Sequence, residues 1–114
     1  MDNKEFYDTV KKLREQQRLF FREHDKNTTL RHCKDLEQVV DEALQNDGIP
    51  TLESAKHFRA AVWLMRKLQR SFFAHYSKDI LAQAKRQERV VDKWINTTES
   101  NIVSKMQPTL NFGG

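Results

Sequence analysis

The sequence predicts an all-α protein made of two tandem helical hairpins, and three observations support that prediction. Turn formers are scarce, with three Gly and two Pro among 114 residues, which disfavours a sheet fold. Hydrophobic residues recur at intervals of three and four positions, the spacing of one helix face. A residue pattern in the first half of the chain also returns in the second half, so two similar units are expected.

The internal repeat has an offset of 52 positions in its first helical pattern and, after a one-residue deletion, 51 in its second. The matched pairs are Phe6 with Phe58, Val10 with Val62, Leu13 with Met65, Arg14 with Arg66, Gln17 with Gln69, Phe20 with Phe72, Leu30 with Leu81, Glu37 with Glu88, Val40 with Val91 and Asp41 with Asp92. Residues shared by both units are best explained by the common fold, so we expect function to depend on positions where the units differ.

Polar breaks divide each unit into two helices. Residues 24–29 are too polar to bury and end in hydroxyl residues that suit a helix start, and residues 75–79 form the corresponding break. Gly48 and Pro50 lie between the units, where they end a helix. The four helices are expected near residues 4–24, 28–46, 52–76 and 78–98.

These helices are expected to form a single domain over residues 1–98, built from repeats at 4–46 and 52–98, with residues 99–114 as a less regular tail. Short connections make the two helices of each unit antiparallel neighbours. The hairpins then form either one four-helix bundle or an elongated pair that is completed by oligomerisation.

Repeated charged residues predict a structural clamp of Arg14 with Glu37 and of Arg66 with Glu88. Facing residues in an antiparallel hairpin have a constant sum of residue numbers, which places the two members of each pair at the same level. Both glutamates lie in apolar stripes, where an unpaired carboxylate is costly. We therefore expect each arginine to hold its glutamate with a two-pronged hydrogen bond. The other interpretation is a polar pocket for a ligand.

The second unit carries the positive charge of the chain. Residues 1–50 hold nine Lys or Arg against eleven Asp or Glu, whereas residues 51–114 hold eleven against five. Basic residues beside flat aromatic rings can bind phosphates and stack on bases, so a nucleic-acid or nucleotide-binding protein is the alternative function. A solvated helix face with partly buried tryptophans explains the same pattern. The candidate residues are Arg59, Trp63, Arg66, Lys67, Arg70 and Trp94.

The sequence lacks recognisable catalytic and metal-binding signatures. The four His lack the helical spacing of a zinc site, Cys33 has no second Cys, and no glycine-rich loop is available for phosphate. We therefore expect no catalytic residue, no metal and no cofactor. The longest apolar run, residues 60–65, is too short to span a membrane, and the start lacks a secretion signal, so a cytoplasmic location is expected.

The repeated pattern Val-x2-(Leu/Met)-Arg-x2-Gln-Arg-x-Phe-Phe, followed by Leu-x3-Lys-x2-Glu-x2-Val-Asp, covers most of residues 6–95. It resembles small uncharacterised helical proteins of gut-type bacteria and of their phages or mobile elements. That resemblance implies a small accessory binding protein in preference to a metabolic enzyme, and it names no partner.

A short motif near the end of the chain has the form Gln-x2-aliphatic-x-Phe, at Gln107, Leu110 and Phe112. It resembles the peptide by which bacterial replication and repair proteins dock on the sliding clamp. In that resemblance Gln107 bonds at the rim of a pocket, and the two apolar residues fill a cleft. The alternative is that Leu110 and Phe112 fold back on the helices or contact a neighbouring chain.

The expected function is therefore that of a non-catalytic helical binding or adaptor protein that acts through protein–protein contacts. The doubled aromatics at Phe20-Phe21 and Phe72-Phe73 point in two directions on a helix, so they cannot all face one neighbour. Together with the small core, they favour a homo-oligomer.

Overall fold

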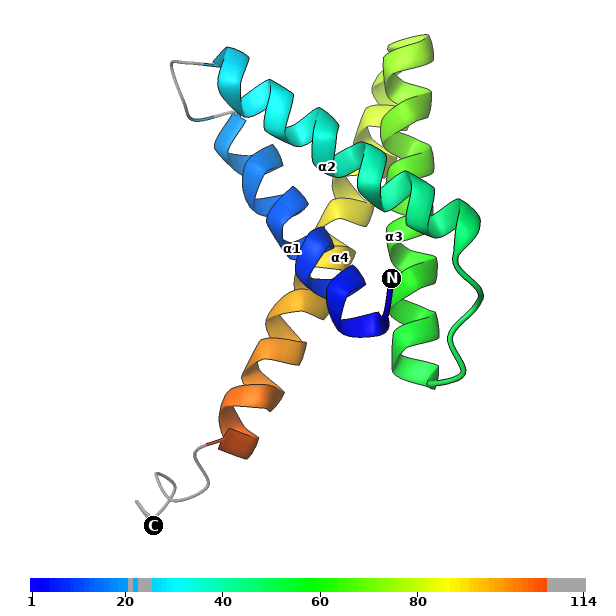
Figure 1. Cartoon of the computed structure of the whole chain (residues 1–114). Helices are drawn as coiled ribbons and strands as arrows, with labels where there is room; N and C mark the ends of the chain where they lie inside the picture. The colour runs from blue at the N-terminus through cyan, green and yellow to red at the C-terminus, as the bar shows by residue number, and fades with distance from the viewer. Residues whose placement is uncertain (21, 23–25, 107–114) are drawn as a thin grey trace.

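The computed structural model consists of four α-helices in its described part, with no strand there, which confirms the expected all-α fold (Figure 1). It describes the backbone of residues 1–20, 22 and 26–106 and the side chains of residues 1–20, 22 and 28–99. The helices are α1 (Asn3–Phe20), α2 (Lys26–Asn46), α3 (Glu53–His75) and α4 (Lys78–Met106). Among the described residues, every helix falls short of the apolar length that a bilayer crossing requires.

The helices pair as two antiparallel hairpins, α1 with α2 and α3 with α4. Between the hairpins, α2 contacts α3 and α1 contacts α4. The end of α1 and the start of α2 lie at the same end of the molecule as the end of α3 and the start of α4. The two hairpins stand apart there, so they meet near their middle and splay toward these tips (Figure 1). The architecture is thus a two-hairpin helical bundle that is open at one end.

Local interactions set two of the helix ends. At the start of α1, Oδ1 of Asp2 accepts a hydrogen bond from the backbone N–H of Glu5 at 2.8 Å, as an N-cap residue does. At the end of α3, Tyr76 adopts the left-handed backbone conformation with φ of 52°, and its N–H donates to the backbone oxygen of Phe72 at 2.6 Å. The chain therefore turns into α4 within a few residues.

The last helix is longer than expected. We expected it to end near residue 98, but α4 continues to Met106. No helix-breaking Gly or Pro occurs between Lys78 and Pro108, and an ion pair between Glu99 and Lys11 ties this part of α4 to α1. The expected start of the tail at residue 99 is therefore wrong. Outside the described residues lie the three positions of the sliding-clamp motif, Gln107, Leu110 and Phe112.

Equivalent residues of the repeat form the core. The rings of Phe6 and Phe58 meet edge to face with their centroids 6.0 Å apart, a favourable aromatic geometry. Val40 of α2 and Val91 of α4 are both fully buried. The buried residues are Phe6, Val10, Leu13, Arg14 and Gln17 on α1 and Phe58, Val62, Met65, Arg66 and Gln69 on α3. The sequence repeat is thus also a repeat in the packing.

Removing a buried side chain tests this core. Leu13 is fully buried, whereas Leu64 on α3 is 39% exposed. Because truncation of a buried leucine removes packing and leaves a cavity, Leu13→Ala should lower the free energy of unfolding by about 2–5 kcal/mol, and Leu64→Ala by less than about 1 kcal/mol. Urea unfolding followed by circular dichroism measures both values. Equal losses would contradict the assigned core.

Candidate functional site

Two glutamines lie at the centre of a buried polar network between the hairpins. Nε2 of Gln17 donates to Oε1 of Gln69 at 3.2 Å, and Nε2 of Gln69 donates back to Oε1 of Gln17 at 3.2 Å. Both side chains are buried. Because the two glutamines are equivalent positions of the repeat, their reciprocal bonds imply an approximate two-fold axis that passes between them.

An arginine one turn earlier on each helix extends the network to the opposite hairpin. Nη1 of Arg14 donates to Oε1 of Gln17 at 2.6 Å. Its Nε and Nη2 donate to the two carboxylate oxygens of Asp92 on α4, at 2.8 and 3.0 Å, which is a bidentate pairing. The second repeat has the same arrangement, with Arg66 bonded to Gln69 at 2.7 Å and to Asp41 at 2.8 and 2.9 Å.

Two glutamates complete the network. Nε2 of Gln17 donates to Glu37 at 3.2 Å, and Nε2 of Gln69 donates to Glu88 at 2.7 Å. Each glutamine amide therefore makes two bonds through its nitrogen and two through its oxygen, the full capacity of the group. We call this set the central network: Arg14, Gln17, Glu37, Asp41, Arg66, Gln69, Glu88 and Asp92.

The expected pairing of arginine and glutamate within each hairpin is wrong. Nη1 of Arg66 lies 3.3 Å from a carboxylate oxygen of Glu37, and Nη1 of Arg14 lies 3.8 Å from one of Glu88, so each arginine faces the other hairpin's glutamate. The physical reason is that the equivalent faces of α1 and α3 meet at the axis, which brings each guanidinium across to the other side. The predicted clamp residues do come together, but they hold one hairpin to the other.

The charges in and around the central network lower the pKa of Asp41. Burial raises the pKa of Asp41, but the hydrogen bonds and charge of Arg66, with those of Arg70, outweigh burial and hold that pKa below its ordinary value of 3.8. Arg70 lies 3.1 Å from Asp41, and in the other repeat Arg18 lies 3.2 Å from Asp92. With these two outer arginines included, four arginines face the four carboxylates of the central network, and their formal charges cancel.

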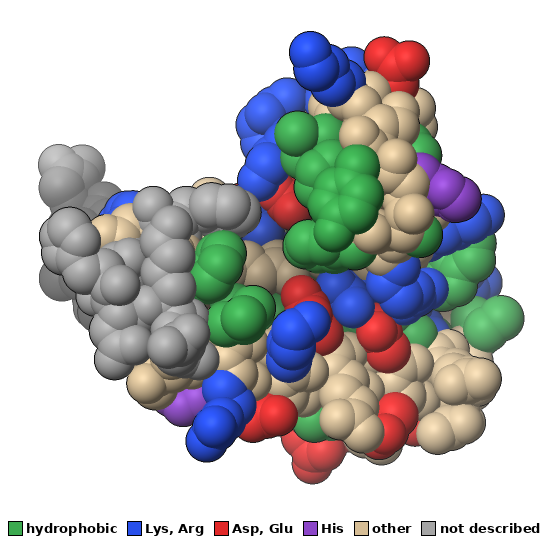
Figure 2. Space-filling view, turned by 90° about the horizontal axis from the view of Figure 1, so that it is seen from above, with side chains coloured by type: hydrophobic (Ala, Val, Ile, Leu, Met, Phe, Trp, Pro, Cys, Tyr) green, Lys and Arg blue, Asp and Glu red, His purple; other side chains and the backbone are tan. Residues whose placement is uncertain are grey.

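A groove opens at the tips of the hairpins, with the central network as its floor. Seen from above in Figure 2, hydrophobic side chains lie on both sides of the hollow between the tips, and charged side chains lie at its bottom. Its volume is about 120 Å³. We call it the tip groove, and its lining residues are Gln17, Phe20, Leu30, Cys33, Glu37, Gln69, Phe72, Phe73, Leu81, Ala84, Lys85 and Glu88.

The walls of the tip groove are apolar and partly open to solvent. Phe73 is 65% exposed, and Leu30 and Leu81 are exposed as well. Cys33 is buried, and burial, with the nearby charge of Glu37, raises the pKa of its thiol, so it contributes a neutral side chain. The sequence alone does not reveal this groove. Its only sequence signal was the doubled aromatic pair that includes Phe73.

Two arginines of the predicted nucleic-acid-binding patch make hydrogen bonds within the protein. Nη2 of Arg59 donates to the backbone oxygens of Ala43, Leu44 and Asp47 at 2.7, 3.0 and 3.0 Å, which satisfies carbonyls at the end of α2. Arg66 is buried in the central network. Arg66 is therefore unavailable to a phosphate, and Arg59 is half-buried beside the first turns of α1 and α3.

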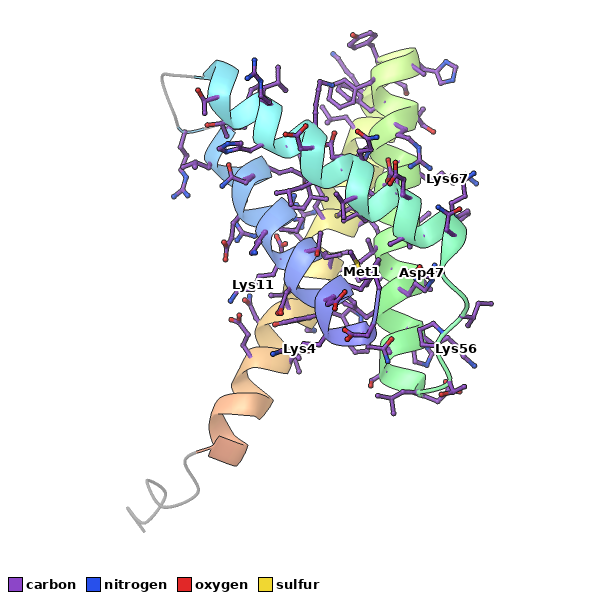
Figure 3. The ribbon with its side chains drawn as sticks, in the orientation of Figure 1. Met1, Lys4, Lys11, Asp47, Lys56 and Lys67 are labelled. Atoms are coloured by element: carbon purple, nitrogen blue, oxygen red, sulfur yellow. The ribbon has the colours of Figure 1, made fainter. Side chains whose placement is uncertain are left out.

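The remaining predicted patch residues divide between two faces. Trp63, Lys67 and Arg70 are exposed, with Nζ of Lys67 5.0 Å from the centre of the Trp63 ring, a cation–π contact. Lys67 projects outward from α3 (Figure 3). Trp94 instead is half-buried and stacks with His57, with ring centroids 6.5 Å apart. The two tryptophans therefore do not form one stacking surface.

In the described part of the chain, no group of three or more His, Cys, Asp or Glu side chains is arranged to hold a metal ion. No protein-family model, curated protein or solved structure matches the chain. Function is therefore inferred from the central network and the cavities around it.

The glutamine pair can be tested by a single-atom change. Gln17→Glu removes the two donors of the amide and places a charge beside Glu37, so it should lower the free energy of unfolding by about 3 kcal/mol. Gln83→Glu, the same change at an exposed position of α4, should cost less than about 0.5 kcal/mol. Chemical unfolding at neutral pH compares the two. Similar small losses would mean that the amide bonds contribute little.

The depressed pKa of Asp41 predicts acid sensitivity. When folding lowers the pKa of a carboxyl group, that group adds its full stability at pH values above its unfolded-state pKa. The added stability is lost as the pH falls through the folded-state pKa. The wild-type free energy of unfolding should therefore fall below about pH 4, and Asp41→Asn should flatten part of that fall. Unfolding curves between pH 2 and 6 measure it, with Asp35→Asn on the exposed face of α2 as the charge control. Identical pH profiles for both variants would refute the assignment.

Proposed function

We propose that this chain is a small non-catalytic binding protein that acts through protein–protein contact, and that the tip groove is the contact surface, occupied by the tips of a second copy. The observation that carries the proposal is the exposed apolar wall of the groove. Phe73 and Tyr76 are 65% and 72% exposed at the tip of the second hairpin. Large apolar groups gathered around a groove are typical of an interaction site.

The symmetry of the groove supports a second copy as its occupant. Its walls come from equivalent positions of the repeat, Phe20 with Phe72 and Leu30 with Leu81, so both sides present the same chemistry around the approximate axis. A contact between identical chains uses the same patch on both partners and requires it to be self-complementary. A groove with two equal walls meets that requirement when two open ends face each other.

The central network supports a non-catalytic role. Its carboxylates are each bound by a guanidinium, a glutamine amide or both, and its amides are saturated. Groups engaged in this way stabilise the arrangement of the hairpins. The alternative of nucleic-acid binding has less support, because Arg66 is buried in the central network and Trp63 and Trp94 lie on different faces.

Self-association can be measured directly. Sedimentation equilibrium at micromolar concentration should give a mass of twice the 13.6 kDa chain. Phe73→Lys and Leu81→Lys each place a charge in the apolar wall and should weaken the dimer at least tenfold. Val90→Lys changes an equally apolar, 42% exposed residue of α4 that does not line the groove, so this control should remain a dimer.

Three outcomes would contradict the proposal. A wild-type monomer would mean that the groove is not filled by a second copy, whether or not a foreign helix binds there. A dimer that survives Phe73→Lys would have its interface elsewhere. Equal weakening by Val90→Lys would remove the link to the tip groove.

A further inference from the structure

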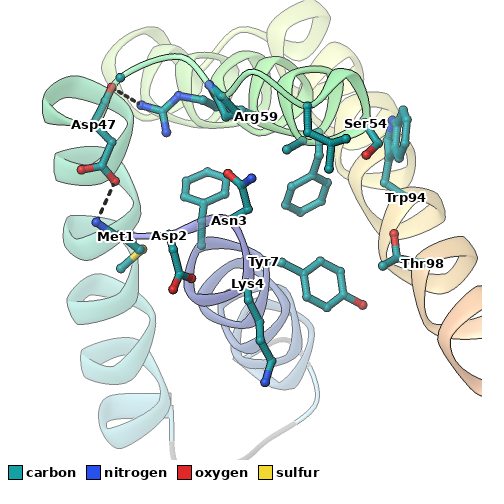
Figure 4. Close-up of a pocket in the computed structure, with 16 residues that line it drawn as sticks. Met1, Asp2, Asn3, Lys4, Tyr7, Asp47, Ser54, Arg59, Trp94 and Thr98 are labelled. Atoms are coloured by element: carbon teal, nitrogen blue, oxygen red, sulfur yellow. Dashed lines mark hydrogen bonds and ion pairs between the residues drawn. The ribbon is translucent and has the colours of Figure 1, made fainter. Parts of the chain in front are cut away.

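A second cavity lies at the opposite end of the bundle from the tip groove, beside the first turns of α1 and α3 (Figure 4). Its volume is about 320 Å³, within the range of cavities that hold small organic molecules. The rings of Phe6 and Phe58, which meet across the approximate two-fold axis, line its interior. We call it the basal pocket.

The basal pocket lies on the same axis as the tip groove, but its two halves differ chemically. Tyr7 and Arg59 occupy equivalent positions of the repeat. Their anchoring is also equivalent, because the Tyr7 hydroxyl donates to the backbone oxygen of Ile95 at 3.2 Å and Arg59 donates to that of Leu44, the matching residue, at 3.0 Å. One structural position is thus an aromatic phenol in one hairpin and a cation in the other.

Two further pairs of equivalent positions also differ between the two sides of the pocket. Trp94 lines the pocket where the first hairpin has Ala43, and Thr98 lines it where the first hairpin has Asp47. Figure 4 places Arg59 and Asp47 together at one side, with Tyr7, Trp94 and Thr98 at the other. The pocket therefore has a charged side and an aromatic side, which suits a ligand with a charged head and an aromatic body.

The charged side has binding capacity that the protein does not use. All the hydrogen bonds of Arg59 to described residues run through Nη2, which leaves Nε and Nη1 without a partner among them. The guanidinium is also held in place, since it lies 5.5 Å from the centre of the Phe6 ring. Nη1 carries two N–H donors and part of the positive charge, so it can donate a charge-assisted hydrogen bond to a carboxylate oxygen.

The two carboxylates that line the pocket already have partners. Oδ1 of Asp2 accepts a hydrogen bond from the backbone N–H of Glu5 at 2.8 Å. Oδ2 of Asp47 has no hydrogen bond to a described residue but lies 3.5 Å from the amino group of Met1, which offsets its charge. Lys4 also lines the pocket. On the aromatic side, burial, with the charge of Glu99, raises the pKa of Tyr7, so its phenol remains neutral.

We propose that the basal pocket binds a small organic carboxylate with an aromatic body. The carboxylate receives a hydrogen bond from Nη1 of Arg59, and the ring packs against Phe58, Tyr7 and Trp94. This site is independent of the tip groove and of self-association.

Three probes that share a ring and a chain length test the head group: 3-phenylpropionate, 3-phenylpropylamine and 3-phenylpropanol. Titrations followed by two-dimensional NMR of the 15N-labelled full chain should show saturable shifts of the Trp94 indole N–H and the Ala55 amide with the carboxylate. The amine and the alcohol should bind at least tenfold more weakly. Absence of saturable shifts with 3-phenylpropionate, or equal binding of the amine, would overturn the proposal.

Variants locate the site. Ala55 lines the pocket and Ala60 is exposed outside it, so Ala55→Leu should abolish 3-phenylpropionate binding and Ala60→Leu should leave it unchanged. Arg59→Lys keeps the charge but loses the fixed Nη1 donor, and should weaken binding at least fivefold. The NMR spectrum of the free variant reports whether α2 is still ordered. Binding that survives Ala55→Leu, or that is lost equally with Ala60→Leu, would refute the assigned pocket. Phe73→Lys should bind like the wild type, which separates this result from the test of the tip groove.

Discussion

The reciprocal amide pair of Gln17 and Gln69 is the constraint on which the arrangement of the two hairpins depends. A buried amide with both donors and both acceptors engaged tolerates little displacement, because any shift leaves a buried polar group without its partner. The two arginine–aspartate pairs radiate from this centre and reach the opposite hairpin on both sides. The core supplies the driving force for association, while the amides and guanidiniums select one relative placement of the hairpins.

Both cavities follow from that placement. The hairpins meet around the axis and diverge toward their tips, so the tip groove opens over the network. At the other end, the edge-to-face rings of Phe6 and Phe58 close the core, and the first turns of α1 and α3 leave the basal pocket beside them. One cavity retains the symmetry of the repeat and the other departs from it. The symmetric one suits a copy of the same chain, and the asymmetric one suits a ligand with unlike ends.

The sequence predicted the helices and their buried faces well, because apolar spacing at residues such as Val10 and Leu13 reports directly on one face of a helix. It could not predict which aspartate Arg14 binds. Since the repeat places the same carboxylates in both hairpins, pairing within a hairpin and pairing between hairpins look identical in the sequence, and only the crossing of the helices decides. The tip groove escaped prediction for a related reason: Phe73 reads equally well as a core residue or as an exposed one. The basal pocket arises from Tyr7 and Arg59, which become comparable only when the repeat is superimposed in space.

The exchange of charges between the hairpins makes each hairpin depend on the other. Arg14 and Arg66 each find their aspartate on the other hairpin, so neither hairpin holds its own arginine and aspartate together. Two identical copies of one hairpin would satisfy each other in the same way. The residues at the centre of the axis are accordingly the same in both repeats, whereas those around the basal pocket differ.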